Sequence, residues 1–210
     1  MRRWLFKYRL SSLLGAVAVT ALLLGGYIAP SLRQRDAVAA LRARRVIVRY
    51  SCERDSLERF TPGPFASVRD SLGNIIGHDW VSGVAGLDFR LLDDDTTDED
   101  LAAALQFPKL RMLAIYDRDE PDVHLRHIVR LRHLEHLDIS STDITDASLP
   151  QLSRLSKLRE LLLGRGISDD GIEHIRRLQT LERLYIIPTQ ITAAGAAELQ
   201  LALPNCRVVH

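Results

Sequence analysis

A motif that recurs every 23 or 24 residues is the feature that most constrains how this chain can fold. Five successive segments open with apolar residues in the pattern L-x-x-L-x-L, namely Val84/Leu87/Phe89, Leu110/Leu113/Ile115, Leu134/Leu137/Ile139, Leu158/Leu161/Leu163 and Leu181/Leu184/Ile186. A second landmark keeps the same period and stands four residues before an apolar residue, at Thr97, Pro121, Thr145, Ser168 and Thr192. Two landmarks that stay in register over five segments indicate internal repeats.

Each repeat reads as a short strand, a turn and a helix of two or three turns. Four of the five second landmarks are Ser or Thr, the residues preferred at a helix N-cap. Asp98, Asp146 and Asp169 follow a landmark directly and place a carboxylate in the first helical turn, where the helix dipole favours it. A unit of this length cannot bury its apolar face alone, so the pattern predicts an α/β solenoid of about five stacked units.

The units resemble leucine-rich repeats of the subclass L-x-x-L-x-L-x-x-T-x-I-T-D-x-G-L. One unit matches this motif at Thr142, Ile144, Thr145, Asp146 and Leu149. Ser148 replaces the usual glycine there, whereas the next unit keeps it as Gly171. The ending LPNCRVV, Leu203 to Val209, is similar to the terminal half-repeat of this class. With its N-terminal segments, the chain resembles the small membrane-anchored leucine-rich-repeat proteins of planctomycete-type bacteria, and that resemblance implies no settled molecular function.

The chain is expected to divide into five parts. They are a short basic tail (1–9), a transmembrane signal-anchor helix (10–29), a basic juxtamembrane linker or helix (30–45), an N-terminal α/β cap (46–80) and the leucine-rich-repeat domain with its half-repeat (81–210). Within the cap, the residue pattern predicts a strand at 46–50, a turn at 62–64 and a short helix at 65–72.

The membrane prediction rests on 20 residues without a charge, at 10–29. As a helix they would span about 30 Å, the thickness of the hydrocarbon core of a bilayer. A cleaved secretory signal is the alternative, but the nearest small-x-small site, Ala37-Val38-Ala39, lies well past the apolar run. Basic residues flank the run on both sides. We expect a single-pass cell-membrane protein whose repeat domain lies on the exported, periplasmic side.

Charge and cysteine content exclude several classes of function. Residues 1–45 carry nine Lys or Arg and one acid, giving +8, whereas residues 46–210 carry 19 basic and 26 acidic residues, giving −7. An acidic body repels phosphate backbones, so we expect no nucleic-acid partner. Cys52 and Cys206 are too few and too far apart for a disulfide framework or a metal cluster.

The stretch HLDIS, residues 136–140, places His136, Asp138 and Ser140 on alternate positions and raises the question of a catalytic triad. Side chains two residues apart on a strand are separated by about 6.7 Å of backbone rise, and a triad requires hydrogen-bond contact between its members. Since Leu137 and Ile139 belong to the core pattern, the three polar residues are expected on the outward face of a strand. We therefore predict no catalytic residues and no enzyme activity.

Two other patterns suggest metal binding. The acidic run at 93–100 lacks the glycine and glutamate that a calcium loop needs at its sixth and twelfth positions. His124 and His127 fall on a predicted helix, whereas His133 and His136 surround the following strand, so the four imidazoles are not expected to converge. We predict neither a metal nor a cofactor.

The outward strand positions form the candidate binding surface, because solenoids present an extended face to partners. Charged and aromatic residues occupy this predicted face: Asp88, Arg90, Tyr116, His136, Asp138, Glu160, Arg183 and Tyr185. The expected function is non-covalent recognition of a protein or a cell-envelope component. The alternatives are a structural scaffold that associates with itself and, less favoured, a hydrolytic or metal-dependent enzyme. The identity of the partner stays open.

Overall fold

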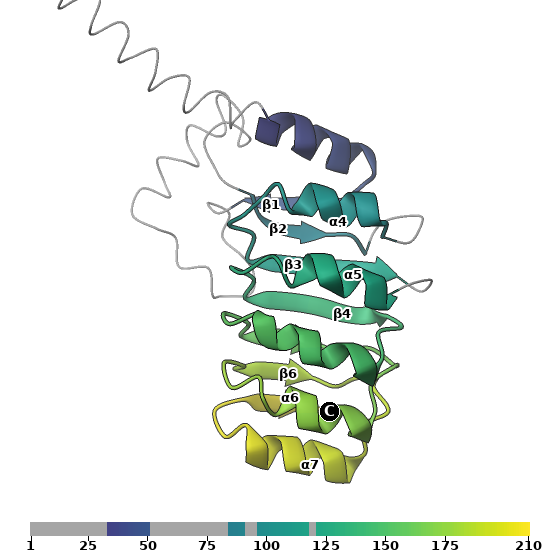
Figure 1. Cartoon of the computed structure of the whole chain (residues 1–210), viewed down its shortest axis with the longest axis vertical. Coiled ribbons are helices and arrows are strands. Elements are labelled where there is room, and N and C mark those ends of the chain that lie inside the picture. Colours follow the sequence, from purple (N-terminus) through teal and green to yellow (C-terminus); the bar gives the residue numbers. More distant parts are fainter. Residues whose placement is uncertain (1–32, 51–83, 91–95, 118–120) are drawn as a thin grey trace, which may run out of the picture.

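The computed structural model describes residues 33–50, 84–90, 96–117 and 121–210. In these parts seven strands form one sheet in chain order: β1 (Ile47–Tyr50), β2 (Val84–Asp88), β3 (Met112–Asp117), β4 (His136–Thr142), β5 (Glu160–Leu162), β6 (Arg183–Tyr185) and β7 (Arg207–Val209). β1 runs antiparallel to β2, and every later strand is parallel to its predecessor. Figure 1 shows the strands stacked along the long axis of the molecule.

A helical segment follows each strand from β2 to β6. These segments are α4 (Asp98–Ala104), α5 (Pro121–Ile128), the 3-10 helix η1 (Asp146–Arg154), the short η2 (Asp169–Gly171) continued by α6 (Ile172–Ile175), and α7 (Ala193–Ala202). They line one side of the sheet (Figure 1), so the other side of the strands carries no helix from the described residues. Five strand–helix units and a final half-unit, β7, thus make up a mixed α/β repeat fold in the described residues.

The core is a column of leucines that occupy the same place in successive units. Leu87, Leu113, Leu137, Leu161 and Leu184 are direct neighbours across the paired strands, and each is fully buried. Full burial of one such side chain contributes about 1.5–3 kcal/mol relative to leaving it exposed. The one-unit period of the sequence therefore becomes a continuous core only when the units stack.

The helical segment of the third unit differs from the expected α-helix. It forms the 3-10 helix η1 and contains Pro150. Proline has no backbone N–H, so it cannot donate the hydrogen bond to the residue four positions earlier that an α-helix needs. Its ring also clashes with the carbonyl four residues earlier in an α-helix, so Pro150 disfavours the α-helical form of this segment.

The Ser and Thr landmarks begin the helical segments, as the sequence predicts. Thr97 caps α4, and its side chain and that of Asp100 each accept a hydrogen bond from the other's backbone N–H. The Ser168 hydroxyl accepts from Asp170 N at 3.3 Å, and the Thr192 hydroxyl accepts from Gly195 N at 3.1 Å. The cap prediction is confirmed at these three positions.

Two aspartates join successive units, and we call them the stacking aspartates. Asp146 accepts hydrogen bonds from the backbone N–H of Ser168 at 3.0 Å and from its hydroxyl at 2.6 Å. Asp169 accepts the equivalent two bonds from Thr192, at 2.9 and 2.8 Å. From the sequence, these carboxylates are expected to interact with the helix dipole of their own unit. In the structure their main contacts are with the cap residue of the following unit.

The N-terminal end of the array is covered by helix 33–43 and by β1, which is the strand expected at 46–50. Val38 and Leu41 of this helix are buried in the common core. The Arg44 guanidinium lies 2.8 Å from the Asp100 carboxylate of α4, and the Arg42 guanidinium donates to the Tyr50 hydroxyl at 3.0 Å. The turn expected at 62–64 and the helix expected at 65–72 lie outside the described residues.

The fold class predicted from the sequence needs one correction, because it included a transmembrane helix. No helix in the described parts of the chain is both long and apolar enough to cross a membrane. A crossing helix requires about 20 apolar residues, whereas α7 has 10. The segment to which the prediction applied, 10–29, lies outside the described residues. The fold class is accordingly a mixed α/β repeat fold with a seven-stranded sheet.

Candidate binding surface on the strand face

The open face of the sheet carries three rows of side chains that cross the strands, and we define them by residue. The leading row follows the first leucine of four units and contains Arg111, Glu135, Arg159 and Glu182. The first strand row contains Gly86, Met112, His136, Glu160, Arg183 and Arg207. The second strand row contains Asp88, Ala114, Asp138, Leu162, Tyr185 and Val209.

A hollow of about 270 Å³ opens on this face. It is lined by the whole leading row and by three members of the first strand row: Arg111, Glu135, Arg159, Glu182, His136, Glu160 and Arg183. Every lining residue has a polar or charged side chain, and together they come from four successive units. A single hollow is therefore built from the same two positions of neighbouring repeats.

Glu160 lies at the centre of the charge network in the hollow. The His136 ring nitrogen Nδ1 is 2.8 Å from a carboxylate oxygen of Glu160, and the Arg183 guanidinium donates to the same oxygen. Burial by itself raises the pKa of Glu160, but the hydrogen bonds from His136 and Arg183 outweigh it and hold the pKa below its ordinary value. Glu160 is consequently ionised at neutral pH.

The leading row contains two further ion pairs. An Arg111 guanidinium nitrogen lies 2.6 Å from Glu135, and an Arg159 nitrogen lies 2.5 Å from Glu182. The backbone N–H of Glu135 donates to the Arg111 carbonyl, and the same contact repeats from Arg159 to Glu135 and from Glu182 to Arg159. This backbone ladder places side chains of opposite sign side by side along the row.

A second cluster lies in the second strand row, where Arg90 bridges two carboxylates. Its guanidinium contacts Asp88 through two nitrogens, at 3.0 and 2.7 Å, and Asp138 through a third at 2.9 Å. Only the methyl group of Ala114 lies between these two carboxylates in the row, so the Arg90 side chain can reach across β3 to Asp138 on β4. Burial raises the pKa of Asp88, but the hydrogen bonds from Arg90 prevail and lower it below the ordinary value.

The residues of HLDIS do not form a triad. His136 contacts Glu160 on the neighbouring strand, whereas the Ser140 hydroxyl donates to Asp138 at 2.6 Å. Asp138 also accepts from the Ser140 backbone N–H at 3.0 Å and from Arg90. The His136 imidazole and the Ser140 hydroxyl thus contact different carboxylates, which belong to two separate ion-pair clusters.

Aromatic and apolar side chains gather at the C-terminal end of the face. Tyr185 is half-buried and lies beside Leu162 and Val209 in the second strand row, and Ile187, two residues further along the chain, is 58% exposed. Tyr116 is half-buried as well, but it belongs to β3 and is three strands away from Tyr185. The two predicted tyrosines are therefore not part of one patch.

The eight predicted residues fall into three groups. Arg90 joins Asp88 and Asp138, Glu160 joins His136 and Arg183, and the two tyrosines stand apart. The three carboxylates are more buried than a solvated face would allow, with exposed fractions of 3% for Asp88, 9% for Asp138 and 8% for Glu160. The long arginine side chains cover them, which sequence alternation alone does not reveal.

Sequence reasoning missed the leading row. The outward-facing positions of each strand were taken to begin one residue later. The pattern therefore did not predict an outward position for four residues: Arg111, Glu135, Arg159 and Glu182. The signal was present, because the residue that follows the first leucine alternates in sign over four consecutive units.

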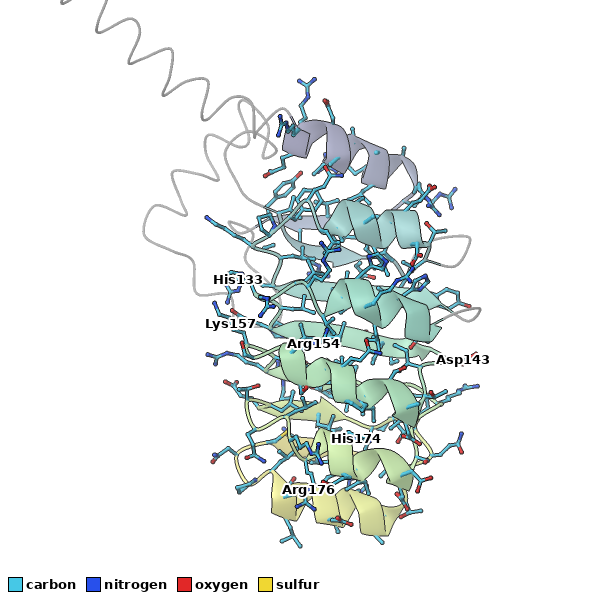
Figure 2. All side chains as sticks on the ribbon, viewed as in Figure 1. His133, Asp143, Arg154, Lys157, His174 and Arg176 are labelled. Atoms are coloured by element: carbon cyan, nitrogen blue, oxygen red, sulfur yellow. The ribbon has the colours of Figure 1, made fainter. Side chains whose placement is uncertain are left out.

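The histidines lie in different places, as expected. The His124 and His127 rings lie 3.3 and 3.6 Å from one oxygen of Asp98 on the helical side. His136 belongs to the strand face, and His133 projects from the edge where the strands begin (Figure 2). Among the residues that the structure describes, no group of three or more His, Cys, Asp or Glu could hold a metal ion.

No protein-family model and no curated protein matches the chain. Among solved structures, it is similar to a leucine-rich-repeat protein of Leptospira interrogans, with 20% sequence identity and a TM-score of 0.35. The match covers 51% of this chain and 33% of that one, so it spans about a third of that protein's length. The strand–helix repeat described above therefore rests on the chain's own sequence period and strand register.

Proposed function

We propose that this chain recognises a protein partner non-covalently through the strand face. The observation that carries the proposal is the hollow formed by four successive units, in which Arg, Glu and His side chains are held in fixed positions by one another. Repeat proteins use such an extended face for binding because it presents many side chains on a rigid scaffold.

The chemistry of the face suits a protein surface. Arg183 and Arg159 offer guanidinium groups that can make several hydrogen bonds each, and Tyr185 supplies aromatic area beside them. Their ion pairs hold these long side chains in place before binding, so less conformational entropy is lost on association. An apolar patch is typical of the centre of an interface, and charged groups are typical of its rim.

Hydrolytic chemistry has less support. A general acid or base works best when its pKa lies near the operating pH. The pKa of Glu160 is instead lowered by hydrogen bonds from His136 and Arg183, and that of Asp88 by hydrogen bonds from Arg90. The hydroxyl of Ser140 donates to a carboxylate that Arg90 already neutralises. A cell-envelope partner and an exported location remain predictions, which fractionation of the source cells would test.

The proposal is tested by affinity capture with the full chain as bait. In one variant Glu160→Ala and Arg183→Ala remove an ion pair from the strand face. The matched control removes an ion pair from the helical side, with Glu173→Ala and Arg177→Ala, whose side chains lie 2.9 Å apart. We expect the control to retain the wild-type partner and the strand-face variant to lose it. Equal retention by both variants would contradict the proposal.

A further inference from the structure

The leading row is its own electrostatic complement when it is read backwards. From β3 to β6 its signs are positive, negative, positive and negative, for Arg111, Glu135, Arg159 and Glu182. The reversed order is negative, positive, negative and positive. A surface with this property fits a second copy of itself if the copy lies opposite with its units in reverse order.

We infer that the partner of the strand face is a second copy of this chain, related by a twofold axis parallel to the strands that passes between β4 and β5. This inference rests on the proposed function, because it names the occupant of the same face. Such an axis brings the two faces together, keeps the strand directions parallel and reverses the order of the units. It also closes the assembly as a symmetric dimer.

In the leading row every facing pair has opposite charges. Arg111 faces Glu182 of the second copy, and Glu135 faces Arg159 of the second copy, and symmetry repeats both contacts. The pairs already present within each chain, Arg111–Glu135 and Arg159–Glu182, need not break. Each is a dipole, and the twofold axis sets it antiparallel to a dipole of the other copy. Networks of four charges therefore replace isolated pairs.

The first strand row obeys the same axis independently. His136 faces Glu160 of the second copy, and Met112 faces Arg183 of the second copy. His136 and Glu160 already attract each other within one chain, at 2.8 Å. No like-charged residues of this row meet, since Arg207 faces Gly86 of the second copy. Two rows with different residues thus agree on one arrangement.

Two other arrangements of the copies oppose like charges instead. An axis that passes through β4 itself would place Arg111 against Arg159 and Glu135 against Glu135 of the second copy. An axis along the stack of strands would place every leading-row residue against itself. Like charges directly opposed suppress association, so the pattern selects one register among its neighbours.

The side chains of the leading row are accessible enough for this contact. The exposed fractions are 59% for Arg159, 39% for Glu182, 31% for Arg111 and 20% for Glu135. Pairs with such exposure are screened by salt, whose screening length is about 10 Å at 0.1 M and about 3 Å at 1 M. The dimer is therefore weak and depends strongly on ionic strength.

Charge reversal gives a test that does not depend on a single variant. In Arg159→Glu, two facing contacts between copies become carboxylate against carboxylate. In Glu135→Arg, the same two contacts become guanidinium against guanidinium. A mixture of the two variants has opposite charges at all four leading-row contacts, and the double variant E135R/R159E restores them in a single chain. Self-association should weaken in each single variant and return in the mixture and in the double variant.

The measurement uses two differently tagged copies of the full chain, kept in a non-ionic detergent because residues 10–29 are apolar. Retention of the second copy by the first is compared at low salt and at about 1 M salt. We expect wild-type retention at low salt only, at least about tenfold weaker binding for each single variant, and recovery on mixing. Circular dichroism confirms that each variant folds.

Three results would overturn the inference: no self-association of the wild type at low salt, self-association that both reversals leave unchanged, or no recovery in the mixture and the double variant. A wild type that stays monomeric but still captures another protein through Glu160 and Arg183 would remove only this inference. A wild type that neither associates with itself nor captures another protein would remove the proposed function as well.

Discussion

Carboxylates occur in two regions of the molecule, and the two sets have different partners. At the edge where the helices begin, Asp146 and Asp169 accept hydrogen bonds from the backbone and hydroxyl groups of the next unit. On the strand face, Asp138 and Glu160 contact arginine side chains. The first set fixes how units stack, whereas the second set orders cationic side chains that a partner can contact. Carboxylates thus stabilise the stack in one region and, on the proposed function, support recognition in the other.

The largest effect on stability is expected at the edge. Asp146→Ala removes the acceptor of two hydrogen bonds and leaves the Ser168 N–H and hydroxyl to water, which lowers the free energy of unfolding by about 2–3 kcal/mol. Asp138→Ala on the face also removes two hydrogen bonds, from the N–H and the hydroxyl of Ser140, but these lie within one strand rather than between units. Since Arg90 also keeps its two contacts with Asp88, this variant should lower the free energy of unfolding by less. Urea unfolding of both variants measures the difference. A larger loss for Asp138→Ala would reverse the comparison.

A glycine beside each stacking aspartate makes room for it. A Cβ added at Gly171 would lie 2.4 Å from an Asp146 carboxylate oxygen and 2.7 Å from a Leu149 methyl group. Gly171→Ala should lower the free energy of unfolding by about 1–3 kcal/mol, because the aspartate must move out of its hydrogen-bonded position. In an Asp146→Ala background the same substitution should cost less. A double-mutant cycle by urea unfolding measures this coupling, and strict additivity would contradict it.

The repeat period, the leucine column and the helix caps could be predicted from the sequence, because each depends on spacing within one chain segment. The stacking aspartates and the Arg90 bridge could not, since both depend on which residues of neighbouring units face each other. Arg90 crosses Ala114 only because three strands are in register. The 3-10 form of η1 has a visible cause in Pro150, but the repeat pattern favoured an α-helix there.

The strand face should also give the protein a specific acid sensitivity. The folded-state pKa of Glu160 is lower than its value in the unfolded chain, so its contribution to stability is complete above the unfolded pKa. That contribution is lost as the pH falls from the ordinary glutamate value, 4.5, through the lower folded value. Glu160→Gln should flatten the pH dependence of unfolding in this window. An unchanged slope below pH 4.5 would contradict the role of His136 and Arg183.

The smallest effect is expected for the ion pair between Glu173 and Arg177 on the helical side. Both side chains are more than half exposed, and solvent-exposed pairs contribute little to stability. Glu173→Ala with Arg177→Ala should leave the urea midpoint unchanged within error. A clear shift would mean that exposed pairs matter here, and that the control for the strand face must be chosen elsewhere.

The central claim is that the edge serves stacking while the strand face serves recognition, and a paired capture measurement tests it most directly. The Asp146→Ala chain and the Glu160→Ala/Arg183→Ala chain are used as baits under conditions in which circular dichroism shows both to be folded. The account predicts that the edge variant, although less stable, retains the wild-type partner and that the strand-face variant loses it. Loss of the partner by the edge variant, with retention by the strand-face variant, would contradict the account.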